Sequence, residues 1–393
     1  MSETATAAAR PATGRRHYGA IDGYRAVAAL AIVVFHVAFL SGLGLRHPWP
    51  GLFLARLDVG VALFFVLSGF LLYRPFAVAH LRSTATPDLR RFYGRRLLRI
   101  VPAYWVTLVV VAYVLHQNPI RGPGDVVTYF GFLQIYSKSH LNGGISQAWS
   151  LCTEMSFYLA LPLWAWAVRG AACRRGTSAL RAEVAGVAGL YLSGLALRAA
   201  IALGGLRRPI DIRLDWLPLT ADLFALGMAL AVATAWAEGG GRLPAPVDAM
   251  ARRPWACWSC AGAAYVVVAM VVFRRRDLGE PMTAGQVMGR EVLYGVVAVL
   301  LVLPGVIGPE RAGAIRRGMH SRVLMWLGLI SYGIYLTHNA VLDQAFTSGH
   351  LRPMDSTFAP LLAVTAGGAV VAAVALHLLI ERPALRLKER LER

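Results

Sequence analysis

Apolar residues along this chain are gathered into blocks of roughly 18 to 23 residues, the length that an α-helix needs to cross a lipid bilayer. Hydrophobic residues make up 57% of the chain and charged residues 16%, whereas a soluble domain carries about a quarter charged residues. A transmembrane β-barrel would instead show alternating segments of about ten residues. The pattern therefore predicts an all-α fold, a polytopic membrane bundle of about ten transmembrane helices.

The predicted membrane spans follow one another along nearly the whole chain. They cover residues 24–43, 58–77, 97–116, 148–168, 183–203, 216–237, 254–273, 291–308, 323–345 and 359–380. The segment 126–137 is also apolar, but it is too short to span a bilayer and is expected to be re-entrant or interfacial.

The net charge of +19 would suit a nucleic-acid partner, but its distribution argues against one. With the N-terminus placed in the cytoplasm, the inside segments carry about twice as many Lys and Arg residues as the outside loops, as the positive-inside rule describes. Both termini are therefore expected in the cytoplasm, and the protein in the inner membrane. The loop with Arg274, Arg275 and Arg276 lies on the wrong side of this assignment and leaves the helix count open there.

The chain reads as one membrane domain with short tails. Residues 1–19, rich in Ala and Thr, are expected to form a disordered cytoplasmic tail, residues 20–383 the membrane domain, and residues 384–393 a second cytoplasmic tail. The first apolar block has no small-residue cleavage site after it and is expected to remain as a signal anchor. Cys257 and Cys260 form a CxxC inside an apolar span without a second pair, which favours packed thiols over a metal or redox site.

Four ionisable residues are predicted at one depth of the bundle. Ionisable groups inside a membrane are costly and are functional candidates by default. His36, Glu154, Asp222 and His338 each lie six or seven residues from the outer end of their span, or about 10 Å below the surface. This coincidence favours one shared site. The alternative is a polar network that only holds the helices together.

Two of these residues belong to longer polar stripes. Arg25 precedes His36 by eleven residues, which places the two on nearly the same helix face about 16 Å apart. Ser150, Glu154 and Tyr158 are spaced at i, i+4 and i+8 and form a stripe on an otherwise apolar helix.

Arginines gather at the predicted cytoplasmic ends of the first three spans. They are Arg25, Arg74, Arg95, Arg96 and Arg99. Arg96 and Arg99 share a helix face because they are three residues apart, and guanidinium groups suit the clamping of phosphates. The sequence leaves two ligands open for this cluster, lipid headgroups and an anionic substrate.

The combination suggests acyl transfer. A histidine beside a carboxylate can take a proton from an alcohol, because the carboxylate fixes the imidazole tautomer and supports its charged form. A phosphate-binding rim about 16 Å from His36 suits a carrier with phosphates at one end and a reactive group at the tip of a long arm. Coenzyme A has that shape.

Six short motifs along the chain carry a family resemblance. They are Arg25 and His36 with ten residues between them, DVGVALFFVLSGFLL (58–72), FYGRRLLRIVPAYW (92–105), AWSLCTEMSFYLALP (148–162), LGLISYGIYLTHNAVL (327–342) and ERP (381–383). In this order and at this spacing, the chain resembles the acyltransferase-three family of bacterial membrane proteins over nearly its whole length. Around Glu154, the chain has Thr153, Met155 and Ser156, which differ from the residues that family members often have there. This difference is expected to affect the acceptor side of the site.

The resemblance implies a ten-helix fold and transfer of a short acyl group, often acetyl, from acyl-CoA to a hydroxyl. The acceptor would be a carbohydrate of a surface glycan or a glycosylated small molecule, and the chain is expected to be a stand-alone member without a fused domain. No metal would be needed.

The same resemblance implies a role for each candidate residue. His36 would be the general base or a transient acyl carrier, and Glu154 would orient it. The coenzyme A phosphates would be held by Arg25, Arg74, Arg96 and Arg99. The substrate cavity would be lined by Ser68, Ser150, Asp222, Tyr332, Tyr335 and His338.

Other functions and several details stay open on the sequence alone. A transporter could use the same groups as a proton relay, although paired halves with interrupted helices are not visible. A non-catalytic membrane sensor is a third reading. The sequence does not determine the acceptor, the acyl chain, the side from which the acceptor enters, a covalent acyl-enzyme or the oligomeric state.

Overall fold

The structure is a computed structural model that describes residues 18–391, except 142, 206–210, 274–280, 309–312 and 350. Within this described part the chain is helical and contains no strand, which confirms the predicted all-α bundle. The expected N-terminal tail, up to residue 17, and the basic loop 274–276 lie outside the described residues. The expected C-terminal tail is helical as far as Leu391.

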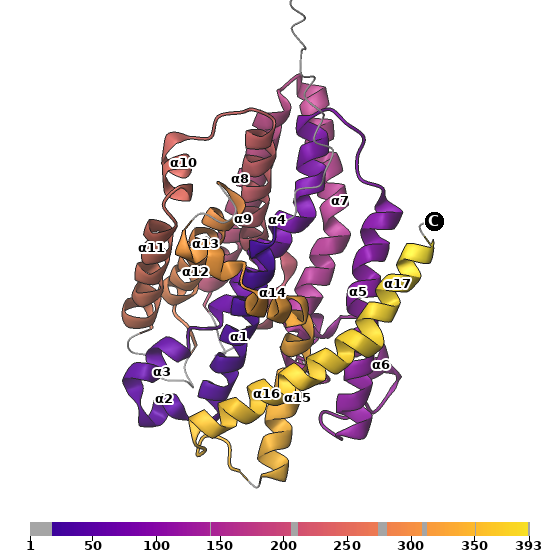
Figure 1. Cartoon of the computed structure of the whole chain (residues 1–393), viewed down its shortest axis with the longest axis vertical. Coiled ribbons are helices and arrows are strands. Elements are labelled where there is room, and N and C mark those ends of the chain that lie inside the picture. Colours follow the sequence, from indigo (N-terminus) through magenta and orange to yellow (C-terminus); the bar gives the residue numbers. More distant parts are fainter. Residues whose placement is uncertain are drawn as a thin grey trace, which may run out of the picture.

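Nine helical segments of the described chain are long and apolar enough to cross a membrane. Their helices are α1 (Ala20–Leu40), α4 (Val59–Leu81), α5 (Leu89–Val109) with η1 (Val110–Val114), α7 (Trp149–Arg175), α8 (Ala179–Leu203), α9 (Leu217–Glu238), α11 (Pro254–Val267) with η5 (Val268–Val272), α12 (Ala284–Val306) and α16 (Phe358–Leu376). In Figure 1, α16 continues through η6 (His377–Glu381) into α17 (Arg382–Leu391) as one long element. The protein is therefore a multi-pass membrane protein.

The remaining predicted span, 323–345, is two helices in the structure. The chain forms α14 (Arg322–Leu329) and α15 (Ser331–Ser348), with a break at Ile330. The Ser331 hydroxyl donates a hydrogen bond to the Gly328 carbonyl at 2.8 Å across this break. Because α15 carries several polar residues, it is less apolar than the other spans, and the ten predicted helices become nine apolar spans and one polar helix.

Short helices mark the two ends of the bundle. Helices α2 (Leu43–Arg46), α3 (Pro48–Leu54) and α6 (Pro123–Phe130) lie at one end with the connection between α15 and α16, and α10 (Ala245–Ala251) lies toward the other (Figure 1). These are called the α6 end and the α10 end below. The short helix α6 with the 3₁₀ turn η2 (Gln134–Tyr136) occupies the segment predicted to be interfacial.

Helices α4 and α9 pack very closely against each other, and this contact determines how both are positioned at the site. A Cβ atom on Gly227 would lie 2.0 Å from the Val66 carbonyl oxygen, so only glycine allows this approach. Small residues at such contacts let helix backbones approach closely in membranes, where apolar burial alone drives little association. The tight contact fixes the rotation of α4, which lines both cavities described below.

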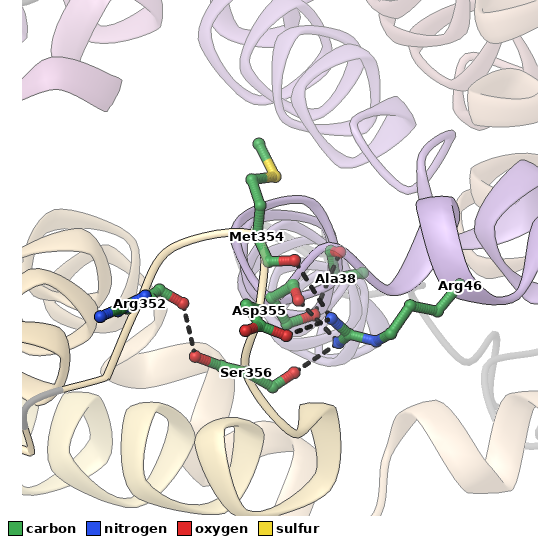
Figure 2. Close-up of polar contacts among 7 residues, drawn as sticks. Ala38, Arg46, Arg352, Met354, Asp355 and Ser356 are labelled. Carbon is green, nitrogen blue, oxygen red and sulfur yellow. Dashed lines mark hydrogen bonds and ion pairs between the residues drawn. The ribbon is translucent and has the colours of Figure 1, made fainter.

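Arg46 ties the end of α1 to the connection between α15 and α16, as Figure 2 shows. Its guanidinium donates to the carbonyl oxygens of Ser41 at 2.7 Å, Ser356 at 2.5 Å and Met354 at 3.1 Å. The Met354 amide in turn donates to the Leu40 carbonyl at 2.7 Å. Gly42 turns the chain between these partners with φ of +74°. The clamp therefore holds the end of the helix that carries His36.

Replacing Arg46 by alanine is expected to lower stability, because three carbonyl groups lose a charged donor. A hydrogen bond to a charged group contributes about 1.5–3 kcal/mol when its partner is lost, so the thermal unfolding midpoint in detergent should fall by several degrees. Asp355→Ala is the matched control, since it removes only an exposed ion pair of 3.8 Å, worth little. Equal midpoints for the two variants would contradict the clamp.

Candidate functional site

A cavity of about 440 Å³ lies between α1, α4, α5, α7 and α15. It gathers most of the residues predicted for the site onto one surface. The predicted residues among its lining are Arg25, Ser68, Arg96, Arg99, Ser150, Glu154, Tyr332 and Tyr335. They come from five separate helices, so the cavity unites motifs that are far apart in the sequence.

The α10 end of this cavity is strongly basic. Arg25 lies near the start of α1, and Arg95, Arg96 and Arg99 lie on the first turns of α5. Arg96 lies over the Phe92 ring at 4.1 Å and donates to the Phe92 carbonyl at 2.9 Å, while its Nε atom is buried without a hydrogen-bond partner. Four guanidinium groups line the cavity together with one carboxylate, that of Glu154, and a cluster of positive charge in a cleft attracts anions. The geometry suits a phosphorylated ligand.

Glu154 lies on the wall of the cavity, in the stripe that its helix was predicted to carry. The Ser68 hydroxyl on α4 donates to its Oε1 atom, and Tyr158 lines the same cavity one turn farther along α7. The negative charge of Glu154 acts on Arg25 and Arg96. The carboxylate therefore balances part of the arginine charge from the facing wall.

Tyr335 and Ser150 form the wall nearer the α6 end. The Tyr335 hydroxyl donates to the Gln147 carbonyl at 2.6 Å and lies 2.6 Å from the Ser150 hydroxyl. Because the tyrosine hydrogen is used on the carbonyl, the Ser150 hydroxyl is the donor in the second bond. Both side chains are thereby fixed in orientation on the cavity surface.

His36 and His338 form a pair behind Tyr335. The Nε2 atom of His338 lies 3.1 Å from Nδ1 of His36, and His338 is fully buried. The Tyr335 and His338 ring centroids are 5.8 Å apart. The cavity lining includes Tyr335 but neither histidine, so the pair stands one side chain behind the wall.

The hydrogen bonds of the pair fix its tautomers. Nδ1 of His338 lies 2.7 Å from the Tyr335 carbonyl oxygen, which can only accept, so this nitrogen carries the hydrogen and Nε2 carries a lone pair. Nδ1 of His36 faces that lone pair and the Ile32 carbonyl at 3.0 Å, so it must be the donor. The Nε2 atom of His36 is then unprotonated and can act as a base.

This arrangement corrects one detail of the sequence-based prediction. Glu154 was expected to orient His36, but the structure gives that contact to His338, while Glu154 pairs with Ser68. The two residues were predicted at one depth, but the carboxylate on α7 bonds to Ser68 of α4 instead of His36 of α1. His338, predicted at the depth of His36 and as part of the cavity lining, is the side chain that contacts His36.

Arg74 lies outside the cavity. Its guanidinium pairs with the Glu238 carboxylate at the end of α9, and its Nε atom donates to the Tyr18 hydroxyl at 3.0 Å. The predicted role of Arg74 in phosphate binding therefore has no support from its position. The residue instead ties α4 to α9 at the α10 end.

Asp222 also lies elsewhere, beside Arg198 and Glu291. Arg198 forms a 3.1 Å ion pair with Glu291 and donates to the Leu214 carbonyl at 3.2 Å. The Oδ1 atom of Asp222 and Nε of Arg198 are buried without a hydrogen-bond partner in the described structure. His36 and Asp222 were predicted at equal depth, but they belong to two different clusters. The reason is that α1 and α9 turn these side chains toward different parts of the bundle.

A second, smaller cavity of about 120 Å³ lies next to this cluster, toward the α6 end. Its charged lining residues are Asp58, Arg198, Asp215, Arg290 and Glu291. Little in the sequence points to this cavity, since Asp58 and Asp215 lie just before long helices, where turn residues are common. The predicted span 291–308 also began too late, because a capping box at Thr283 starts α12 at Ala284.

Comparison with known proteins places the whole membrane domain in one family. A family described as an acyltransferase domain, acyltransferase three, matches residues 18–380. The peptidoglycan O-acetyltransferase OatA of Listeria monocytogenes is 28% identical over 162 residues, 38% of this chain and 24% of that protein. A putative O-acetyltransferase of Staphylococcus aureus (strain COL) is 30% identical over 169 residues, again 38% and 24%.

A longer match extends over most of the chain. The putative peptidoglycan O-acetyltransferase YrhL of Bacillus subtilis is 26% identical over 346 residues, 83% of this chain and 49% of that protein. The matches thus span about a quarter to a half of these relatives. No solved structure matches. With five of the six motifs lining one cavity and the family match over residues 18–380, this chain belongs to the acyltransferase-three family of membrane acyltransferases.

Proposed function

We propose that the protein transfers a short acyl group, acetyl in the simplest case, from acyl-coenzyme A to a hydroxyl group of a carbohydrate or a glycosylated small molecule. One observation supports this proposal above all. The cavity has arginines at its α10 end, and the His36–His338 pair lies behind its wall nearer the α6 end. A phosphorylated carrier would lie with its phosphates among the arginines and its thioester toward His36.

The spacing of Arg25 and His36 along α1 supports this donor. Arg25 and His36 are eleven residues apart on α1, or about 16 Å along the helix. This is of the order of the arm that separates the phosphates of coenzyme A from its thioester. Glu154, with Ser68 and Tyr158, would line the path of the arm and hold it against α4 and α7.

The reaction follows from the tautomers of the histidine pair. The acceptor hydroxyl would give its proton to Nε2 of His36 as its oxygen attacks the thioester carbonyl carbon. A C–O bond then forms, the C–S bond breaks, and the proton passes from His36 to the departing thiolate. The positive charge that His36 carries in between is shared with His338 through the Nδ1 hydrogen bond.

The activities for which two of these relatives are named support the acceptor class. The Listeria monocytogenes and Bacillus subtilis proteins are a peptidoglycan O-acetyltransferase and a putative one, and peptidoglycan is a carbohydrate polymer with free hydroxyl groups. We therefore include the carbohydrate acceptor in the proposal. Acyl-CoA would reach the cavity from its arginine end, which the charge distribution predicts to be cytoplasmic.

The arginine end provides the test of the donor. Arg99→Gln is expected to raise KM for acetyl-CoA about 10- to 100-fold with a smaller change in kcat, because one charge-assisted phosphate contact contributes about 1.5–3 kcal/mol. Arg91→Gln is the matched control, since Arg91 is exposed on the same helix and pairs with Asp88 at 3.8 Å. Steady-state release of coenzyme A by the purified protein measures both. An unchanged KM for Arg99→Gln would exclude this cavity as the donor site.

A further inference from the structure

The two cavities lie in series along one face of α4. Asp58, at the start of this helix, lines the small charged cavity, and Ser68 and Leu72, farther along, line the large one. Between them, Phe65 lines both. Along the helix, the stretch from Asp58 to Leu72 covers about 21 Å. A single side chain therefore stands where the two spaces meet.

Aromatic rings form the partition at this point. The Phe65 ring stacks on Phe224 at 4.6 Å and meets Trp149 edge-on at 6.5 Å. Trp149 faces the charged cavity, and the next residue, Ser150, faces the large one. The partition is thus about one ring thick, and it is held by packing rather than by hydrogen bonds.

The lining of the small cavity suits a polyhydroxylated ligand. The carboxylates of Asp58, Asp215 and Glu291 can accept hydrogen bonds from hydroxyl groups, and the guanidinium groups of Arg198 and Arg290 can donate to sugar oxygens. The mixture of charges gives no strong preference for an anion. Trp149 adds an aromatic surface of the kind that packs against apolar faces of ligands.

Buried polar atoms around this cavity also lack partners. Nε of Arg198 and Oδ1 of Asp222 make no hydrogen bond within the described residues, although these side chains are 1% and 2% exposed. Buried polar groups are normally satisfied by protein, water or ligand.

We propose that the charged cavity binds the sugar that presents the accepting hydroxyl, and that Phe65 separates this acceptor site from the donor cavity. The inference rests on the proposed acyl transfer and adds its second substrate site. Donor and acceptor would then enter from opposite ends of the bundle, the donor from the α10 end and the acceptor from the α6 end. The Phe65 ring would keep water on the acceptor side away from the thioester until a hydroxyl is bound.

Water access to the thioester tests the partition without knowledge of the acceptor. Phe65→Ala is expected to raise acceptor-independent hydrolysis of acetyl-CoA by about tenfold or more over the wild type, because enclosure is what prevents such side reactions. The measurement is chromatography of free coenzyme A. Phe157→Ala is a close control, since the Phe157 ring also stacks on Phe224, at 4.1 Å, but lines neither cavity. Equal rates for the two variants would overturn the partition.

Acceptor kinetics test the sugar site. With soluble muropeptides and chitotetraose as probes, Asp215→Asn and Arg290→Gln should raise KM for the sugar about tenfold or more and leave KM for acetyl-CoA unchanged, since each removes a charged hydrogen-bonding group. Arg213→Gln, an exposed arginine paired with Asp211 at 2.6 Å, should change neither.

The outcomes separate this inference from the proposed function. If neither sugar stimulates coenzyme A release by the wild type, or if the variants leave KM for the sugar unchanged, the sugar site is wrong while the donor site stands. If the wild type neither binds nor cleaves acetyl-CoA, the proposed function itself fails.

Discussion

Replacing His36 by alanine is expected to lower kcat for acyl transfer by about 10²–10⁴-fold, the usual contribution of a positioned general base. The tautomer of the pair leaves Nε2 of His36 unprotonated, and alanine removes that base while the arginine end of the cavity stays intact. The binding of acetyl-CoA should therefore change little. Steady-state kinetics and titration with acetyl-CoA measure the two effects separately.

The matched control for this variant is His47→Ala. His47 is an exposed histidine beyond the same end of α1, so its loss should leave kcat close to the wild-type value. Transfer at a near-wild-type rate by the His36→Ala protein would contradict the assignment of His36 as the base. A loss of acetyl-CoA binding equal to the loss of kcat would instead assign His36 to the donor site.

Replacing His338 by phenylalanine is expected to lower kcat by about 100-fold, whereas His338→Gln should stay within about tenfold of the wild type. His338, together with the Ile32 carbonyl, accepts a hydrogen bond from Nδ1 of His36 and so helps to set its tautomer and to orient its ring. An orienting partner that holds the correct tautomer has large effects when it is lost. The glutamine oxygen can still accept this hydrogen bond, but the phenylalanine ring cannot.

His338 is thus a positioning residue, and rescue by glutamine is the readout that distinguishes positioning from packing. Because His338 is fully buried, both proteins should first be compared with the wild type by thermal unfolding in detergent. If both variants are folded and equally slow, a role in setting the tautomer is wrong. If both are fully active, the histidine pair has no part in the reaction.

Features within one helix could be predicted from the sequence. The stripe of Ser150, Glu154 and Tyr158 lines the cavity as expected, and so do Arg96 and Arg99 on α5. Helical periodicity fixes which side chains share a face before any packing is known. The apolar blocks gave the spans for the same reason, since each block is a local property of the chain.

Contacts between helices could not be predicted in this way. Depth along each helix correctly placed His36 and His338 at one level, but the same argument included Asp222, which packs beside Glu291 on another face of the bundle. Depth fixes only one coordinate, and the rotation of each helix depends on packing such as the close approach at Gly227. Partner choice is therefore a tertiary property.

Polar residues at helix ends were the other source of error. Arg290 and Glu291 were placed at or before the edge of a predicted span, but they lie about two turns inside α12. A hydropathy window discards such polar turns because their charges offset the apolar residues around them. For this reason the charged cavity was not predicted, although its charged residues can be read directly in the sequence.

The most direct test of the account is a structure of the protein with a non-hydrolysable thioether analogue of acetyl-CoA. We expect the phosphates of the analogue beside Arg25, Arg96 and Arg99, and its acyl group beside Tyr335 and His36. Density for the analogue with its acyl end among the arginines, or outside this cavity, would contradict the account.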